Sequence, residues 1–144
     1  MKIHNEMKLS FPSKSCNEAF ARSAVAAFVM NLDPTVSELS DLKTAVSEAV
    51  TNCIVHGYRR QSGEIFLTGK IFENGKVSVK IRDKGCGIEN VEQAMQPLFT
   101  TAADEERAGL GFAVMQSFCD AVRVRSTPGK GTAVTLEKLI GTDE

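Results

Sequence analysis

Residues 47–58, SEAVTNCIVHGY, place two chemically active side chains on one expected helix, and the other motifs of the chain are interpreted relative to this stretch. Glu48 and Asn52 are four residues apart, which puts both on the same helical face. The Asn52 carboxamide can give an oxygen to Mg²⁺, and the Glu48 carboxylate can accept a proton or orient a nucleophile. Such a pair is also common as surface decoration on a helix, so its interpretation depends on the rest of the chain.

Two helices are expected around this stretch. Asp33-Pro34 has the form of an N-cap followed by proline at the first helical position, and Gly57 is a natural helix end. Upstream, an edge strand is expected to end at Pro12, and a helical period begins at Ser13. The expected apolar face of this upstream helix consists of Ala19, Phe20, Ser23, Ala24, Ala27 and Phe28.

The second half of the chain changes to the period of strands. Residues 65–71 and 77–81 are expected to form a hairpin around Asn74-Gly75, and residues 122–136 form another around Pro128-Gly129. Between the hairpins lies a long stretch without a clear period, followed by a helix over 112–118. Helices segregated from a mainly antiparallel sheet predict an α+β two-layer sandwich.

The composition is that of one ordinary globular domain. Of the 144 residues, 42% are hydrophobic and 24% charged, so we expect a single domain over residues 1–144. A net charge of −1 does not favour general binding to nucleic acid or to an anionic membrane. The four cysteines are far apart, and neither an apolar leader nor an apolar run of membrane-spanning length occurs. We therefore expect a cytoplasmic protein with reduced thiols, no membrane partner and no direct nucleic-acid partner.

Two glycine-containing motifs extend the candidate site. Asp83 follows a strand, where its carboxylate can accept a hydrogen bond from the adenine amine, and Gly85 and Gly87 let the backbone pass beneath a flat ring. Gly109 and Gly111 lead into the last helix, whose N-terminal amides can bind phosphate. Taken singly, a plain turn and a glycine hinge are the alternatives. The chain contains no Walker A loop, complete dinucleotide fingerprint or calcium loop.

Together and in this order, the motifs resemble the ATP site of the GHKL family, which includes gyrases, Hsp90 chaperones, MutL and histidine kinases. Glu48 and Asn52 match its N box, residues 83–87 its first glycine box, and residues 109–111 its second. Residues from about 88 to 108 take the place of its mobile ATP lid. The resemblance implies a Bergerat fold, a mostly antiparallel mixed sheet with helices on one face.

The stretches SEAVTNCIVHGY, IRDKGCGI (81–88) and QPLFTT (96–101) are most similar to the anti-sigma-factor serine kinases that act in sporulation. This family implies a homodimer that binds and inhibits an RNA polymerase sigma factor of the sigma F type. It also implies that ATP is used, with Mg²⁺, to phosphorylate a serine on an anti-anti-sigma protein, leaving ADP. Glu48 would then be the catalytic base and Asn52 the Mg²⁺ ligand. The nucleotide contacts implied are Asn52, Asp83, Gly85, Gly87, Thr100, Thr101, Arg107, Gly109, Leu110, Gly111 and Thr132.

Contacts with partners are expected on the first helix and beside the phosphate site. Arg22 lies off the expected apolar face and Glu106 flanks the phosphate site, although a solvated surface charge is an equal alternative for Arg22. Dimerisation is expected to use the N-terminal strand, with its exposed edge at residues 7–11, and the first helix. Relatives often carry Ser or Thr where this chain has Ala108, so phosphate contact there would come from backbone amides and Arg107.

Two alternative functions remain open at this stage. One is a nucleotide-gated module that sequesters a sigma factor without significant phosphotransfer. The other is a GHKL ATPase that releases phosphate without any protein acceptor. Phosphotransfer to a purified anti-anti-sigma protein separates them from the kinase.

Overall fold

The computed structural model describes residues 2–95 and 103–141, with the side chains of 103–110 left out of the description. The strands are β1 (Ile3–Pro12), β2 (Glu64–Phe72), β3 (Lys76–Asp83), β4 (Ala121–Thr127) and β5 (Gly131–Leu139). The helices are α1 (Cys16–Val29), α2 (Val36–Asn52), α3 (Val91–Ala94) and α4 (Ala103–Phe118). A 3₁₀ turn, η1 (Met30–Leu32), precedes α2, and a π-helical segment, η2 (Cys53–Gly57), continues it.

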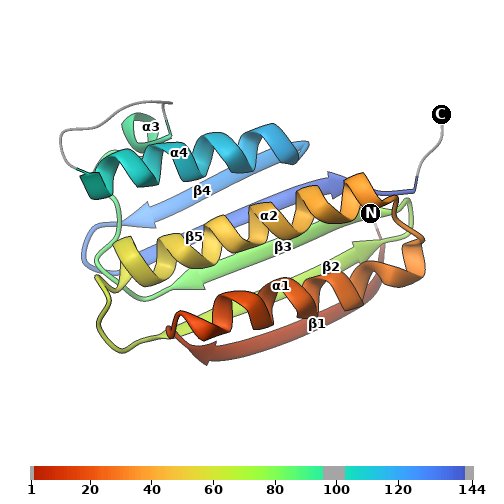
Figure 1. Ribbon diagram of the computed structural model, residues 1–144, viewed down its shortest axis with the longest axis horizontal. Coiled ribbons are helices and arrows are strands. Elements are labelled where there is room, and N and C mark those ends of the chain that lie inside the picture. Colours follow the sequence, from red (N-terminus) through yellow and green to blue (C-terminus); the bar gives the residue numbers. More distant parts are fainter. Residues whose placement is uncertain (1, 96–102, 142–144) are drawn as a thin grey trace.

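The five strands form one sheet in the order β1-β2-β3-β5-β4. Helices α1, α2 and α4 lie side by side over one face of this sheet (Figure 1). The expected α+β two-layer sandwich is therefore confirmed. All four strand pairings are antiparallel, so the strands that the structure describes contain no parallel pair of the kind a mixed sheet would have.

The core lies between the helical layer and the inner face of the sheet. Val77, Val79 and Ile81 alternate along β3 and are fully buried, because successive strand residues point to opposite faces. Leu42 and Val46 on α2 pack in the same core at the spacing of one helical turn. This packing holds α2 across the sheet, with its C-terminal end close to the end of β3 (Figure 1).

The prediction of which face of α1 is buried is wrong. The side chains that α1 buries are Ala21, Val25 and Val29, whereas Phe20 is 48% exposed. The helix is rich in alanine, so more than one face has apolar residues at helical spacing. Contact with the sheet selects the face with two valines, which bury more apolar area than alanines do.

The start of α2 also differs from the expectation. Asp33 has a left-handed backbone (φ 56°) and ends η1, so it is not the N-cap. Thr35 is the N-cap, and it forms a capping box with Glu38: each side chain accepts a hydrogen bond from the other residue's backbone N–H, at 3.0 and 2.9 Å. This reciprocal arrangement satisfies two amides that a helix start leaves without partners, which a single capping side chain cannot do.

The stretch expected to lack regular structure contains α3 and the beginning of α4. Helix α4 begins at Ala103 rather than near Phe112. The sequence at 103–107, ADEER, consists largely of good helix formers and places acidic residues in the first turn, where the helix dipole favours them. Within the described part of the chain, no helix has both the length and the apolarity that crossing a bilayer requires.

Candidate nucleotide site

The carboxylate of Asp83 is the centre of one end of the site. Asp83 is the last residue of β3 and is 4% exposed. Among the residues that the structure describes, it is the one charged side chain that is buried. Its Oδ1 accepts hydrogen bonds from the backbone N–H of Gly85 at 2.9 Å and of Thr132 at 3.3 Å. Burial raises the pKa of Asp83, and these hydrogen bonds oppose the rise only in part. A buried carboxylate held in this way is a strong acceptor for a ligand's N–H group.

Cys53 is a contact of Asp83 that the sequence analysis missed. It begins η2 and is 3% exposed, and its thiol lies near the Asp83 carboxylate and opposes the rise in the pKa of Asp83. Burial and the nearby negative charge raise the pKa of Cys53 well above its usual value, so it stays a thiol. The only signal in the sequence was its place directly after Asn52; the change from α to π helix at this point belongs to the structure.

The loop after Asp83 is held between η2 and the β4–β5 hairpin. The N–H of Cys86 donates to the carbonyl of Gly57 at 2.9 Å, and the Cys86 carbonyl accepts from the N–H of Gly129 at 2.6 Å. A Cβ on Gly85 would lie 2.0 Å from the Gly57 carbonyl oxygen. The glycines predicted for this loop are therefore needed for packing of backbone against backbone, whatever they do toward a ligand.

Gly57 and Gly87 impose the same tight packing on either side of this loop. A Cβ on Gly57 would lie 2.6 Å from Asp83 Oδ2, so this glycine leaves room for the carboxylate; it was predicted only as a helix end. Gly87 has a φ of 78°, and a Cβ there would lie 2.3 Å from the carbonyl oxygen of Thr127. Neither glycine has space for a methyl group where it stands.

The second end of the site lies where α2 meets α4. A Cβ on Gly111 would lie 3.1 Å from Glu48 Oε1 and 3.4 Å from Asn52 Oδ1, so the structure brings these three predicted residues together. The Nδ2 atom of Asn52 is buried and makes no hydrogen bond with the residues described. A buried polar atom without a partner costs free energy, and it is the kind of atom that a bound ligand satisfies.

The other predicted residues are placed as follows. Thr132 on β5 is beside Asp83, and its hydroxyl hydrogen-bonds that of Ser126 at 2.8 Å. Arg22 is partly buried and donates both to Glu18 on its own helix (2.7 Å) and to Ser47 on α2 (3.0 Å), so it ties α1 to α2 next to Glu48.

Several predicted contacts fall where side chains are not described. Thr100 and Thr101 lie outside the described residues, and Glu106, Arg107, Gly109 and Leu110 are placed only as part of α4. The expectation that the second glycine box begins a helix is wrong, because α4 starts at Ala103 and the box lies inside it. Interior amides of an α-helix bond to carbonyls of the preceding turn, so here the two glycines do not form a helix N-terminus.

Comparison with known proteins identifies the type of domain. The profile of the histidine kinase-like ATPase domain matches residues 11–138. The anti-sigma F factor of Thermoanaerobacter sp. (strain X514) is 57% identical over 145 residues, covering 100% of both chains. The chain belongs to the anti-sigma F factor family. Two further anti-sigma F factors are similar over nearly the whole chain. The one from Geobacillus thermodenitrificans is 51% identical over 96% of this chain and 94% of the relative, and the one from Clostridium acetobutylicum is 48% identical over 94% of each.

Solved structures share the fold of this anti-sigma F factor family member. A structure of the RsbU and RsbW domains of a Mycobacterium tuberculosis protein superposes with a TM-score of 0.69 at 18% identity, over 94% of this chain and 32% of that one. A blue-light activated histidine kinase of Erythrobacter litoralis has a TM-score of 0.58 at 22% identity, over 76% of this chain and 32% of that one. The histidine kinase-like ATPase domain implies nucleotide binding, and the two ends of the site fit this role.

Proposed function

We propose that this protein is an anti-sigma factor and an ATP-dependent protein serine kinase. It binds and inhibits an RNA polymerase sigma factor of the sigma F type, and it inactivates the anti-anti-sigma antagonist by phosphorylating a serine. The cytoplasm is the compartment in which these partners meet. The partners are proposed because full-length relatives are named anti-sigma F factors. The observation that carries the nucleotide part is the buried carboxylate of Asp83, held by backbone amides at the end of β3.

Asp83 supports adenine as the base of the nucleotide. Its carboxylate accepts hydrogen bonds and cannot donate one while ionised. For a base bound with its C6 substituent toward Asp83, it therefore matches the amine of adenine and repels the carbonyl of guanine. The backbone N–H groups of Gly85 and Thr132 hold the carboxylate in place. This arrangement favours ATP over GTP.

Asn52 is the residue that fits Mg²⁺. The described residues contain no group of three or more His, Cys, Asp or Glu side chains that could hold a metal, so the ion would be held by few protein ligands, with phosphates and water as the rest. The Nδ2 atom of the Asn52 carboxamide is buried without a hydrogen-bond partner, and the Oδ1 atom of the same group is the hard oxygen that could bind the ion. When bound, Mg²⁺ would neutralise charge on the phosphates.

Glu48 fits the role of catalytic base. It lies one helical turn before Asn52, and Gly111 leaves space beside both side chains. In the proposed step, the substrate serine Oγ forms a bond to the γ-phosphorus while the bond from this phosphorus to the β–γ bridging oxygen breaks. The serine proton passes to Glu48 and ADP leaves. Glu48 orients the hydroxyl and accepts its proton, which are the parts of the reaction that a side chain can assist.

The test is a parallel comparison of Glu48→Gln and Asn52→Ala. Glu48→Gln should lower phosphotransfer to a purified anti-anti-sigma protein by roughly 10²–10⁴-fold, the usual contribution of general-base catalysis, with ATP affinity and sigma binding kept. Asn52→Ala should weaken the Mg²⁺-dependent part of ATP binding itself. Glu73→Gln, on an exposed turn, is the matched control and should behave as the wild type.

The outcomes distinguish the remaining functions. Wild-type phosphotransfer in Glu48→Gln would mean that Glu48 is not the base. Binding of both proteins by the wild type without a labelled serine would favour the nucleotide-gated sigma-binding module. Steady phosphate release without any acceptor protein would favour the bare GHKL ATPase.

The proposal includes a single domain over residues 1–144 that acts as a homodimer, with a lid at about 88–108 and partner contacts by Arg22 and Glu106. The dimer is supported by β1, an edge strand of the sheet, and by Phe20 and Met30, which are 48% and 55% exposed on and just after α1. Light scattering should give twice the mass of the chain at micromolar concentration. A monomer both with and without ATP would contradict the dimer and leave the nucleotide assignment standing.

A further inference from the structure

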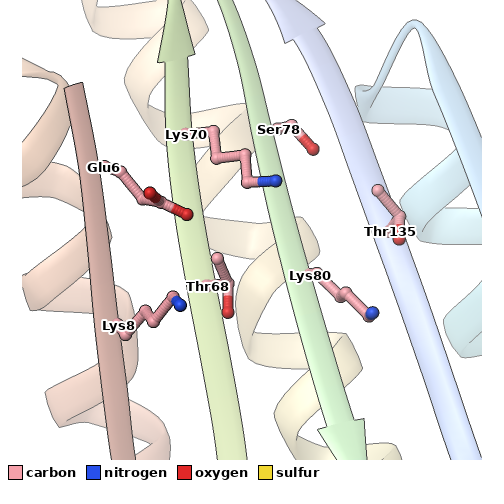
Figure 2. Close-up of a pocket in the computed structure, with 7 residues that line it drawn as sticks. All are labelled: Glu6, Lys8, Thr68, Lys70, Ser78, Lys80 and Thr135. Carbon is pink, nitrogen blue, oxygen red and sulfur yellow. The ribbon is translucent and has the colours of Figure 1, made fainter. Parts of the chain in front are cut away.

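The sheet has a second face that the helices do not cover, and the charged side chains in its hollow are mainly basic. Figure 2 shows a hollow on this face, with a volume of about 390 Å³, lined by side chains from β1, β2, β3 and β5. The residues that line it are Glu6, Lys8, Thr68, Lys70, Ser78, Lys80 and Thr135. We call this surface the open sheet face.

The strand register places cations in a row across the whole sheet. Lys8 pairs with Thr68, Thr68 with Lys80, Lys80 with Thr135, and Thr135 with Arg123 on the far edge strand. Neighbouring strands are about 4.8 Å apart, so the cationic positions on β1, β3 and β4 recur at about 10 Å.

A smaller hollow continues the basic surface toward the end of β3. It has a volume of about 190 Å³, and Arg82, Lys84, Arg125 and Lys130 contribute to its lining. Arg82 on β3 and Lys84 just after the strand flank the buried Asp83, so their side chains point away from the core. The chain as a whole has a net charge of −1, so the positive charge is concentrated on one face.

Three lysines of the open sheet face are not neutralised within the part of the molecule that the structure describes, whereas Arg123 is paired with Glu137. Lys8, Lys70 and Lys80 form no ion pair with any residue that the structure describes. Glu137 is already engaged by Lys76 (3.4 Å) and Arg123. Lys8 and Lys80 lie opposite Thr68 and Thr135 rather than opposite a carboxylate, so an anionic partner gains an attraction that the chain itself does not supply at these two positions.

We propose that the open sheet face is a docking surface for an acidic segment of a partner protein. A second copy of this chain is disfavoured, because a two-fold contact would place these lysines against themselves. Nucleic acid is disfavoured because Arg82 and Lys84 lie over the ring of Phe66, at 4.6 and 5.0 Å from its centroid, which covers an aromatic ring that could stack on a base.

The spacing of the row suggests the form of the acidic segment. In a polyproline II segment, which has three residues per turn, residues three positions apart lie on the same face and are separated by about 9 Å, close to the distance between the cationic positions. A segment of this form with a carboxylate at every third residue can therefore meet Lys8 and Lys80 in turn, and at the next position it reaches Arg123, which is paired with Glu137. This inference goes beyond the proposed function and does not depend on it, because none of these residues belongs to the nucleotide site.

The test uses a fluorescent twelve-residue peptide of repeated Glu-Gly-Ser, with the Gln-Gly-Ser peptide as its neutral counterpart. Fluorescence anisotropy at low salt should show saturable binding of the acidic peptide only, weakening as salt is added. The double variant Lys8→Glu/Lys80→Glu should bind it at least tenfold more weakly. Lys14→Glu/Lys43→Glu makes the same change in net charge away from the open sheet face and should stay within about twofold of the wild type.

Three results would overturn the proposal. The first is no saturable binding of the Glu-Gly-Ser peptide, and the second is equal weakening in both double variants, which would show an effect of net charge alone. The third is tighter binding of a twelve-nucleotide oligothymidylate, lost in Lys8→Glu/Lys80→Glu, which would assign the surface to nucleic acid. ATP binding measured in both variants checks that each is folded, and chemical-shift changes confined to β1, β3 and β4 would support the location.

Discussion

Replacing Asp83 by asparagine separates the contribution of this residue to ligand binding from its contribution to folding. The carboxylate accepts hydrogen bonds at both oxygens, whereas an amide presents an N–H group at one of them. If that group meets the adenine amine, a buried polar group is left without a partner. This costs about 1–3 kcal/mol, so ATP affinity should fall by about 5- to 150-fold.

The same substitution should have the opposite effect on the protein without nucleotide. Burial raises the pKa of Asp83, which means that the folded state disfavours the ionised form. The folded protein then binds this proton more tightly than the unfolded chain does. The free energy of unfolding therefore falls as pH rises from about 3.9, the ordinary value for aspartate, through the raised pKa. Asp83→Asn removes this loss, so at neutral pH the variant should unfold at an equal or higher denaturant concentration.

Two measurements check this reasoning. Isothermal titration with ATP at pH 7 gives the affinity, and urea unfolding between pH 4 and pH 8 gives the pH dependence of stability. Asp33→Asn is the control: Asp33 is exposed, and asparagine tolerates its left-handed backbone. ATP affinity of Asp83→Asn within twofold of the wild type would refute the adenine assignment, and an unchanged pH slope would refute the burial argument.

Two further predictions concern the packing around the site and the start of α2. Gly85→Ala should lose roughly 1–3 kcal/mol of stability and part of its nucleotide affinity, because its Cβ has no space. Gly129→Ala meets no atom within 4 Å and should cost only the roughly 1–2 kcal/mol of a left-handed backbone, with nucleotide affinity kept. Thr35→Ala should cost about 1 kcal/mol in urea unfolding by removing the capping box, while ATP affinity stays unchanged. A loss of ATP affinity in Thr35→Ala would contradict this prediction, because it would mean that the start of α2 affects the nucleotide site at its other end.

The placement of α4 shows what a local pattern fails to decide. The glycines at 109 and 111 indicated a helix start, because glycine weakens a helix and often stands at its ends. The preceding ADEER stretch favours a helix strongly enough to extend α4 back to Ala103. Gly111 is then explained by packing, since a side chain there would press on Glu48 and Asn52.

The sequence by itself determined the order of the main strands and helices and the residues at the two ends of the candidate site. These features rest on local signals, which can be recognised without knowledge of the fold: the strict alternation over 77–81, the turn at Asn74-Gly75 and the spacing of Glu48 and Asn52. Only the tertiary structure decided which face of α1 is buried, that Cys53 and Gly57 surround Asp83, and that basic residues from separate strands form one surface. Those features depend on register and helix packing between distant segments, which no short stretch of sequence encodes.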